Sequence, residues 1–337
     1  MGAEYDEAPR QFVLCQPVLC HDNMSPSLPS MGTPFSPLSP QGDAVRLLIL
    51  VTIVLAGVIA LVVTGLIVYA VIRYRDRGTG VEPPQSGGKR KIEIAYTLIP
   101  LGIQCGLFSL TVWTMHRAEP QAANRAPDLV IVAHQWWWEL HYPGGHVVTA
   151  NEIHLPAGKA IWTELKSADV IHELWIPQLG PKMDAVPGLS NHLMLRADWT
   201  GEYLGDCAEY CGAGHAWMRL RIVVQTPAEF EAWERRQSEP AGMVEGSAER
   251  GREFFQSHTC IQCHAVAGLA LGANVGPDLT HFASRATLGA GVADNTPEKL
   301  RDWLNDPQSM KPGCYMPRMR LSPTDVTNLA AYLEALR

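Results

Sequence analysis

Two long uncharged stretches dominate the N-terminal third of the chain. No charged residue occurs in residues 47–72, and a second uncharged run covers residues 94–115. Each run has at least the ~20 residues that a helix needs to cross a bilayer. Two buried core helices of a soluble protein are the alternative, but basic residues flank the runs as they flank membrane spans. The pattern therefore predicts two transmembrane helices, at about 47–72 and 94–116.

The connector between these runs predicts their orientation. Residues 73–91 hold six basic residues against the two acids Asp76 and Glu82. An excess of positive charge in a short loop is typical of the cytoplasmic side of a membrane. We therefore expect a flexible tail at 1–43, a transmembrane helical hairpin domain at 44–118, and everything after Arg117 on the outer side.

The composition of the chain is that of folded domains. It is 47% hydrophobic and 18% charged, which excludes a disordered protein. The formal charge of −7 argues against nucleic acid as a partner. The eight cysteines form two close pairs and four scattered positions. This distribution is more typical of metal or cofactor sites than of a disulfide framework.

Residues 121–227 are rich in strand signals. β-branched or alternating apolar patterns occur at 129–132, 153–155, 161–165 and 219–224. Short strands at such spacing predict an all-β sandwich or barrel.

One loop concentrates the chemistry of this segment. Cys207 and Cys211 lie four residues apart, His215 follows four residues later, and Met218 three beyond it. His172, which ends a strand-like run, is the natural second imidazole. Thiolates with imidazole and thioether groups favour copper. A zinc site on the two thiols and two imidazoles, or a disulfide, remains open from the spacing alone.

A second motif lies near the C-terminus. After a short polar helix and linker at 228–245, Cys260-Ile-Gln-Cys263-His264 has the spacing for c-type haem attachment, although a redox dithiol has the same pair of thiols. Met316 precedes a proline and is favoured over Met319 as the second axial ligand of the iron. Residues 246–337 have the length of a single cytochrome c domain.

These motifs together resemble subunit II of haem-copper cytochrome c oxidase with a fused C-terminal cytochrome c, the caa-type arrangement. The resemblance runs from Pro37 onward and is carried by His134-Gln135-Trp136-Trp137-Trp138, Asp169-Val170-Ile171-His172, residues 182–188, residues 207–218, and Glu93 ahead of Tyr96-Thr97-Leu98-Ile99-Pro100. It implies a multi-domain membrane protein with a two-helix transmembrane hairpin, an all-β cupredoxin-like copper A domain at 121–227 and an all-α class I cytochrome c domain at 246–337.

The resemblance also implies a role for each matching residue. Cys207 and Cys211 would bridge the two coppers of copper A. The further copper ligands would be His172, His215, Met218 and the backbone carbonyl of Glu209. The haem would be bound covalently by Cys260 and Cys263, with His264 and Met316 as axial ligands. Trp136 would receive electrons from cytochrome c, the Glu209 carboxylate would reach a magnesium ion at the subunit I interface, and Glu93 would lie near the entrance of a proton path.

The implied activity is that of a cytochrome-c oxidase in a bacterial inner membrane, with both outer domains periplasmic. Electrons from a soluble or membrane cytochrome c, or from quinol:cytochrome c reductase, would pass through the haem and copper A to subunit I. There oxygen is reduced to water with proton pumping, and subunit III and membrane lipid would be further neighbours. The electron-input subunit of a copper A-type nitric oxide reductase is the alternative.

Overall fold

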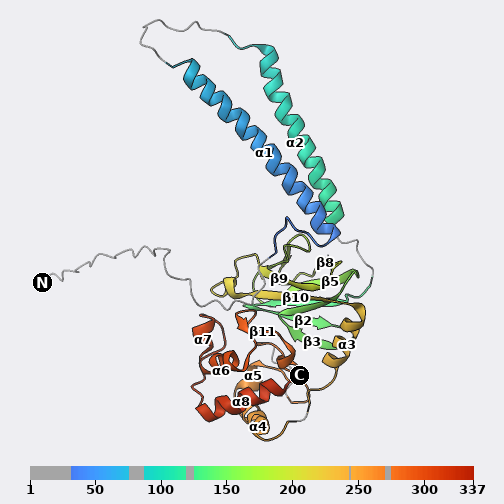
Figure 1. The fold of residues 1–337 in the computed structure, drawn as a ribbon, viewed down its shortest axis with the longest axis vertical. Helices are drawn as coiled ribbons and strands as arrows, with labels where there is room; N and C mark the ends of the chain where they lie inside the picture. The colour runs from blue at the N-terminus through green and yellow to red at the C-terminus, as the bar shows by residue number, and fades with distance from the viewer. Residues whose placement is uncertain (1–31, 76–86, 119–124, 243, 270–274) are drawn as a thin grey trace, which may run out of the picture. The chain divides into compact units, whose positions relative to one another are not determined.

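A computed structural model describes residues 32–75, 87–118, 125–242, 244–269 and 275–337. The expected tail lies mostly outside these residues, as do Cys15, Cys20 and much of the basic connector. Three folded parts follow one another along the described chain: a helical hairpin, a β-sandwich and a small helical domain (Figure 1).

The hairpin consists of helices α1 (Pro40–Arg73) and α2 (Arg90–Ala118). The hydroxyl oxygen of Ser39 accepts a hydrogen bond from the Gly42 amide at 2.9 Å, and this cap starts α1 ahead of the uncharged run. Both helices are long and apolar enough to span a membrane. Most of their large apolar side chains are exposed, which is expected of helices that face lipid or partner helices.

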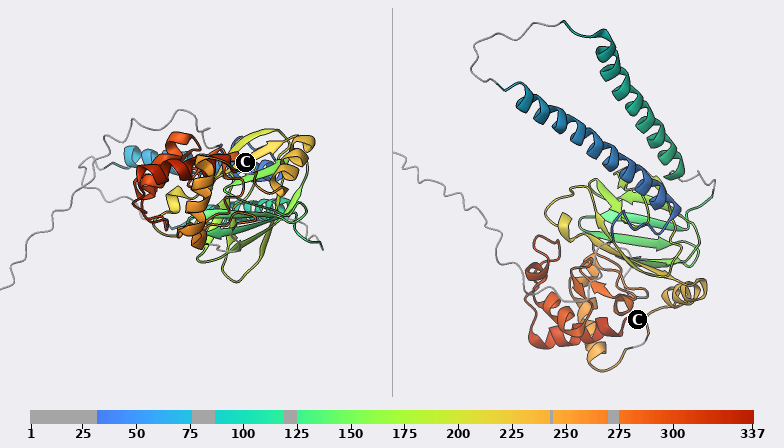
Figure 2. Two further views of the ribbon diagram at one scale, coloured as in Figure 1. Left: turned by 90° about the horizontal axis from the view of Figure 1, so that it is seen from below. Right: turned by 45° about the horizontal axis from the view of Figure 1, so that its top comes forward.

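Ten strands form the β-sandwich (Figures 1 and 2). The sheet orders are β3-β2-β1-β5-β8 and β4-β10-β9-β6-β7. The strands are β1 (Leu129–His134), β2 (Trp137–Tyr142), β3 (Val147–Ala150), β4 (Glu152–Pro156), β5 (Ile161–Ser167), β6 (His172–Trp175), β7 (Met183–Ala185), β8 (Asn191–Leu195), β9 (Gly201–Cys207) and β10 (Arg219–Gln225). The predicted all-β fold of this segment is confirmed.

One hydrophobic core joins the two sheets. Trp138 and Leu140 from one sheet and Ile153 and Ile222 from the other belong to the same cluster of buried residues. Helix α3 (Pro227–Ser238) adds Trp233 to this core. The segment expected to link the two outer domains therefore begins with a helix that packs on the sandwich.

The C-terminal part is helical around a core of its own. Its helices are α4 (Ser247–Ser257), α5 (Cys260–Cys263), α6 (Pro297–Asn305), α7 (Pro307–Met310) and α8 (Pro323–Ala335). A two-residue strand pair, β11 (Thr287–Leu288) and β12 (Ala293–Asp294), is the only sheet among its described residues. Helices α4 and α8 cross where Gly251 lies against the backbone of Asn328.

Buried polar contacts connect this helical domain to the sandwich. The Glu152 carboxylate accepts hydrogen bonds from the amides of Ala286 (3.1 Å) and Thr287 (2.8 Å) and from the Thr287 hydroxyl (3.0 Å). The buried Lys311 ammonium donates to the carbonyl oxygens of Trp136 (2.7 Å) and Gly289 (2.8 Å). Because unpaired buried charges are costly, these contacts specify one docked position for the two domains.

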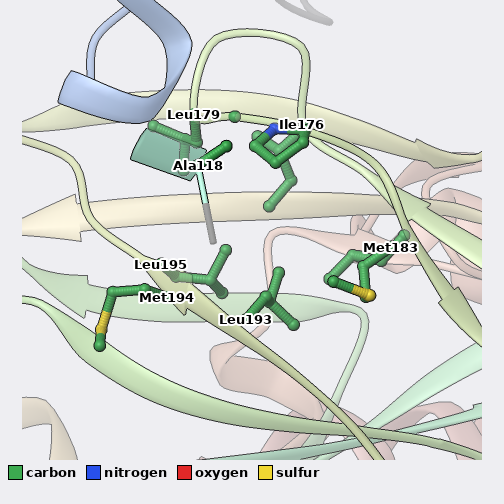
Figure 3. A pocket seen from close by; sticks show the side chains of 10 residues that line it. Ala118, Ile176, Leu179, Met183, Leu193, Met194 and Leu195 are labelled. Atoms are coloured by element: carbon green, nitrogen blue, oxygen red, sulfur yellow. The ribbon is translucent and has the colours of Figure 1, made fainter. Parts of the chain in front are cut away.

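A small cavity lies where α2 meets the sandwich (Figure 3). It holds about 30 Å³ and is lined by apolar side chains, among them Ala118, Leu179 and Leu193. Its size is that of about one water molecule. None of its lining residues carries a charged or imidazole group, so this cavity offers no side-chain acid or base.

The helix crossing at Gly251 predicts a stability effect. A methyl group added there would lie 2.0 Å from the Asn328 carbonyl oxygen and 2.8 Å from the Tyr332 Cβ, so α4 and α8 must separate. We expect Gly251→Ala to destabilise the helical domain by ~1–3 kcal/mol, the usual cost of overpacking. Thermal unfolding followed by circular dichroism measures this. Gly242→Ala is the matched control, because nothing lies within 4 Å of an added methyl there. An equal loss in both variants would contradict the explanation.

The buried Lys311 predicts a pH dependence. Burial lowers the pKa of Lys311 from 10.5 to about 7. Between these values the unfolded chain holds a proton that the folded chain has lost, so stability rises with pH by up to ~1.4 kcal/mol per unit. Below pH 7 this contribution no longer changes. We expect Lys311→Met to remove the slope when thermal unfolding of the variant is compared with the natural chain from pH 6 to 10.

Lys299→Met serves as the control for this comparison, because the Lys299 ammonium is partly exposed in an ion pair with Asp302. A slope that survives in Lys311→Met and matches that of the control would show that another group titrates.

Candidate metal and haem centres

Two thiols face each other at the end of β9. Cys207 is the last residue of that strand, and Cys211 follows in the loop that leads to β10. Their sulfur atoms lie 3.8 Å apart and both thiols are free. A disulfide needs a separation of ~2.05 Å, so the pair is not bonded. Two sulfurs at this spacing are arranged to share metal ions.

Each thiol is paired with one imidazole. The Nδ1 atom of His172 lies 3.9 Å from the Cys207 sulfur. His172 begins strand β6, whereas the sequence pattern predicted that it ends a strand. The Nδ1 atom of His215 lies 3.7 Å from the Cys211 sulfur. The ligand atoms of His172, Cys207 and Cys211 all lie within 4.8 Å of one another, and these three residues are buried.

Two further donors complete the group. The Met218 thioether lies 3.9 Å from the Cys211 sulfur, and the Glu209 carbonyl oxygen lies 3.3 Å from the Cys207 sulfur. A single tetrahedral zinc on two thiolates and two imidazoles would leave both donors without a role. The full set, with one imidazole and one weaker donor beside each sulfur, fits a pair of copper ions better.

The two thiols differ in acidity. Hydrogen bonds from the Cys211 thiol and from His172 lower the pKa of Cys207 well below its ordinary value. The Cys207 thiolate in turn raises the pKa of Cys211. One thiolate is therefore available near neutral pH, and a cation that binds there would displace the proton from the other.

Asp169 orients one of the imidazoles. Its Oδ1 atom accepts a hydrogen bond from Nε2 of His172 at 2.8 Å, which leaves Nδ1 directed toward the sulfurs. Its Oδ2 atom accepts a hydrogen bond from the backbone amide of Gln135 at 2.7 Å. Carboxylates that hold ligand histidines in this way are a common second layer around metals. No role is predicted for Asp169 from the sequence, although it lies only three residues before His172 in the same motif.

Trp136 lies directly against the loop of residues 207–218, which we call the copper loop. Its indole nitrogen donates to the Cys211 carbonyl oxygen at 3.1 Å. A methyl group on Gly214 would come within 2.4 Å of the indole ring, so only glycine permits this contact. Trp136 is 7% exposed and its ring stacks on Tyr315 of the helical domain.

The residues of the helical domain fit a covalently bound haem. Cys260 and Cys263 are free thiols at the two ends of α5, and His264 follows directly. The Nδ1 atom of His264 is hydrogen-bonded to the Pro277 carbonyl oxygen at 2.9 Å, which leaves Nε2 for an iron ion. Gly276 also lies close to this ring, since an added methyl there would lie 2.6 Å from the His264 Cε1 atom.

Met316 lies in the same domain, packed against the core cluster that Cys260 also touches. Its sulfur accepts a hydrogen bond from the Trp303 indole at 3.2 Å, and its carbonyl oxygen accepts one from the Gln308 amide at 2.8 Å. The loop is thereby held with the thioether inside the domain. The sequence-based choice of Met316 over Met319 stays a prediction.

The two predicted carboxylate sites stand apart from these centres. Glu93 lies in the first turn of α2, and the side chains of both Glu93 and Glu209 are exposed. Among the described residues, no group of potential metal ligands includes either carboxylate. Their roles in a proton path and in magnesium binding stay predictions.

Comparisons with known proteins identify the families of both outer domains. Residues 146–226 match the family described as cytochrome c oxidase subunit II, periplasmic domain, and residues 248–337 match cytochrome c. These families imply copper A and haem, respectively. The periplasmic domain of subunit II of cytochrome oxidase from Bradyrhizobium japonicum is 32% identical and covers 34% of this chain and 96% of its own, with a TM-score of 0.32.

Two relatives align with most of the chain. Cytochrome c oxidase subunit 2 of Alkalihalophilus pseudofirmus is 32% identical over 313 residues, which are 90% of this chain and 91% of the relative. The corresponding Bacillus subtilis protein is 31% identical over 291 residues, 80% of this chain and 82% of its own. The chain belongs to the cytochrome c oxidase subunit 2 family, as a membrane-anchored member whose outer side carries a copper A domain and a fused cytochrome c.

Proposed function

We propose that this chain is the electron-input subunit of its oxidase complex and that electrons pass from its own haem to copper A and then to subunit I. The observation that carries the proposal is the convergence of the copper donors around two sulfurs 3.8 Å apart, in a chain that also has a haem attachment site. When bound, the copper pair supplies a one-electron carrier that needs little rearrangement between its redox states.

The side chains of the sandwich would hold that carrier. Cys207 and Cys211 would bridge the two ions, because their sulfurs face each other without a bond. His172 and His215 would each bind one ion through Nδ1. The weaker ligands would be the Met218 thioether and the Glu209 carbonyl oxygen.

The helical domain would hold the haem. Cys260 and Cys263 would form the thioether links, with His264 and Met316 as the axial ligands. Trp136 was expected to receive electrons from cytochrome c. Because Tyr315 covers it, we propose that these electrons come from the chain's own haem domain and that an external cytochrome c or quinol:cytochrome c reductase reduces the haem.

The hairpin would anchor both centres beside the catalytic subunit in a bacterial inner membrane. Subunit I would take the electron, reduce oxygen to water and pump protons, with subunit III as a further neighbour. Glu93, in the first turn of α2, would lie near the entrance of a proton path. Glu209, whose carboxylate is exposed, would bind magnesium at the interface with subunit I.

Two substitutions separate the two centres. In the whole oxidase complex we expect His172→Ala to abolish the mixed-valence copper signal in electron paramagnetic resonance while the c-type haem band remains. We expect Cys260→Ala to weaken covalent haem attachment and leave the copper signal, because the two sites draw on different domains.

His146→Asn is the control for the copper arm, because it changes an exposed histidine in the β2–β3 turn of the same domain. One zinc and no copper per purified chain would refute the copper assignment, and a chain without covalent haem would refute the haem assignment.

A further inference from the structure

Tyr315 lies at the contact between the two redox domains. It directly precedes Met316 in the chain. Its ring stacks on Trp136 of the sandwich, with 5.1 Å between centroids and 30° between planes. Its hydroxyl donates to the side-chain oxygen of Gln135 at 2.6 Å. One side chain of the haem domain therefore touches two neighbouring residues of the copper domain.

Gln135 and Trp136 both form a hydrogen bond with the same atom of the copper loop, the carbonyl oxygen of Cys211. The side-chain nitrogen Nε2 of Gln135 donates to the Cys211 carbonyl oxygen at 2.6 Å, and the Trp136 indole donates to the same oxygen at 3.1 Å. Two short routes thus lead from Tyr315 to Cys211, one through a pair of hydrogen bonds and one through stacked rings.

The loop geometry brings these groups together. Gly313 has a φ of +83°, which glycine adopts without strain, and a methyl there would lie 3.3 Å from the Ala213 Cβ. The loop that carries Met316 therefore touches the loop that carries Cys211 and His215. A bulkier residue at Gly313 or Ala213 would move the two loops apart.

We propose that Tyr315 couples the haem electronically to copper A, through Gln135 and Trp136 to Cys211. The inference rests on the proposed function. In this step the haem iron loses one electron, passing from ferrous to ferric, and the copper pair gains it. No proton or atom is transferred, and Tyr315 stays in its ground state because its bonds and contacts supply only the path.

Tyr315 contributes little to the docking of the domains. Its side chain is 60% exposed, so it buries little apolar area at the contact. Docking is maintained elsewhere, by the Glu152 carboxylate on the amides of Ala286 and Thr287 and by Lys311 on the Trp136 carbonyl. Removing the tyrosine should therefore weaken the path while the domains stay in place.

Three variants in the whole oxidase complex test the proposal. Tyr315→Phe removes the hydroxyl route and keeps the stacked ring, whereas Tyr315→Leu removes both. Arg318→Ala is the control, because the mostly exposed Arg318 pairs with Asp306 within the haem domain. A light-triggered ruthenium donor injects one electron into the haem, and the haem α band and the near-infrared copper band report the transfer.

We expect the rate from haem to copper to fall several-fold in Tyr315→Phe and further in Tyr315→Leu, with no change in Arg318→Ala. Both optical spectra should be unaltered in all three variants. Hydrogen exchange at the amides of Ala286 and Thr287, which Glu152 holds, should keep its protection and thereby report intact docking.

An unchanged rate in Tyr315→Leu, with both centres intact, would overturn the proposal. A slowed rate together with lost amide protection would also overturn it, because Tyr315 would then act in docking. Failure of the proposed function would look different, as absence of the copper or haem band from the unsubstituted chain.

Discussion

The spacing of two sulfur atoms is the constraint on which this architecture depends. Cys207 and Cys211 stay 3.8 Å apart because the loop between β9 and β10 is closed at its base. Asp206 of β9 lies opposite Arg219 of β10 in the antiparallel register of these strands. The Cys207 backbone amide donates to the Met218 carbonyl oxygen at 3.1 Å. A sheet thus fixes both ends of a loop that must hold its sulfurs apart, and such preorganisation leaves little to rearrange when charge changes.

The same loop also serves as a docking surface. Gly212 and Gly214 leave room for the Trp136 ring, and the contact of Ala213 with Gly313 brings in the haem domain. The copper loop is therefore pressed between the sandwich that shapes it and the domain that we propose delivers its electrons. Small residues at these positions serve both functions, since each removes a side chain that would separate the partners.

Sequence reasoning found the residues whose role depends on local spacing. The ligand pattern of residues 207–218 and the haem motif at 260–264 are readable because their members are neighbours in the chain. Tyr315 and Lys311 were missed because their partners, Gln135 and Trp136, lie about 175 residues away and only the docked fold brings them together. The packing of α3 on the sandwich was not predicted either. Its polar composition indicates a linker, but its buried Trp233 contacts core residues that lie far from it in the chain.

Under the proposed function, fusion of the haem domain changes the physics of electron delivery. The copper domain and the linker after it, together residues 121–245, have nine basic and sixteen acidic residues, whereas residues 246–337 have nine of each. A separate donor would rely on charge complementarity, which salt screens. Here the contact is made by buried hydrogen bonds such as those of Glu152 and Lys311, which salt screens little. Ionic strength should therefore act on the encounter with an external donor and leave the internal step almost unaffected, since tethering has replaced diffusion there.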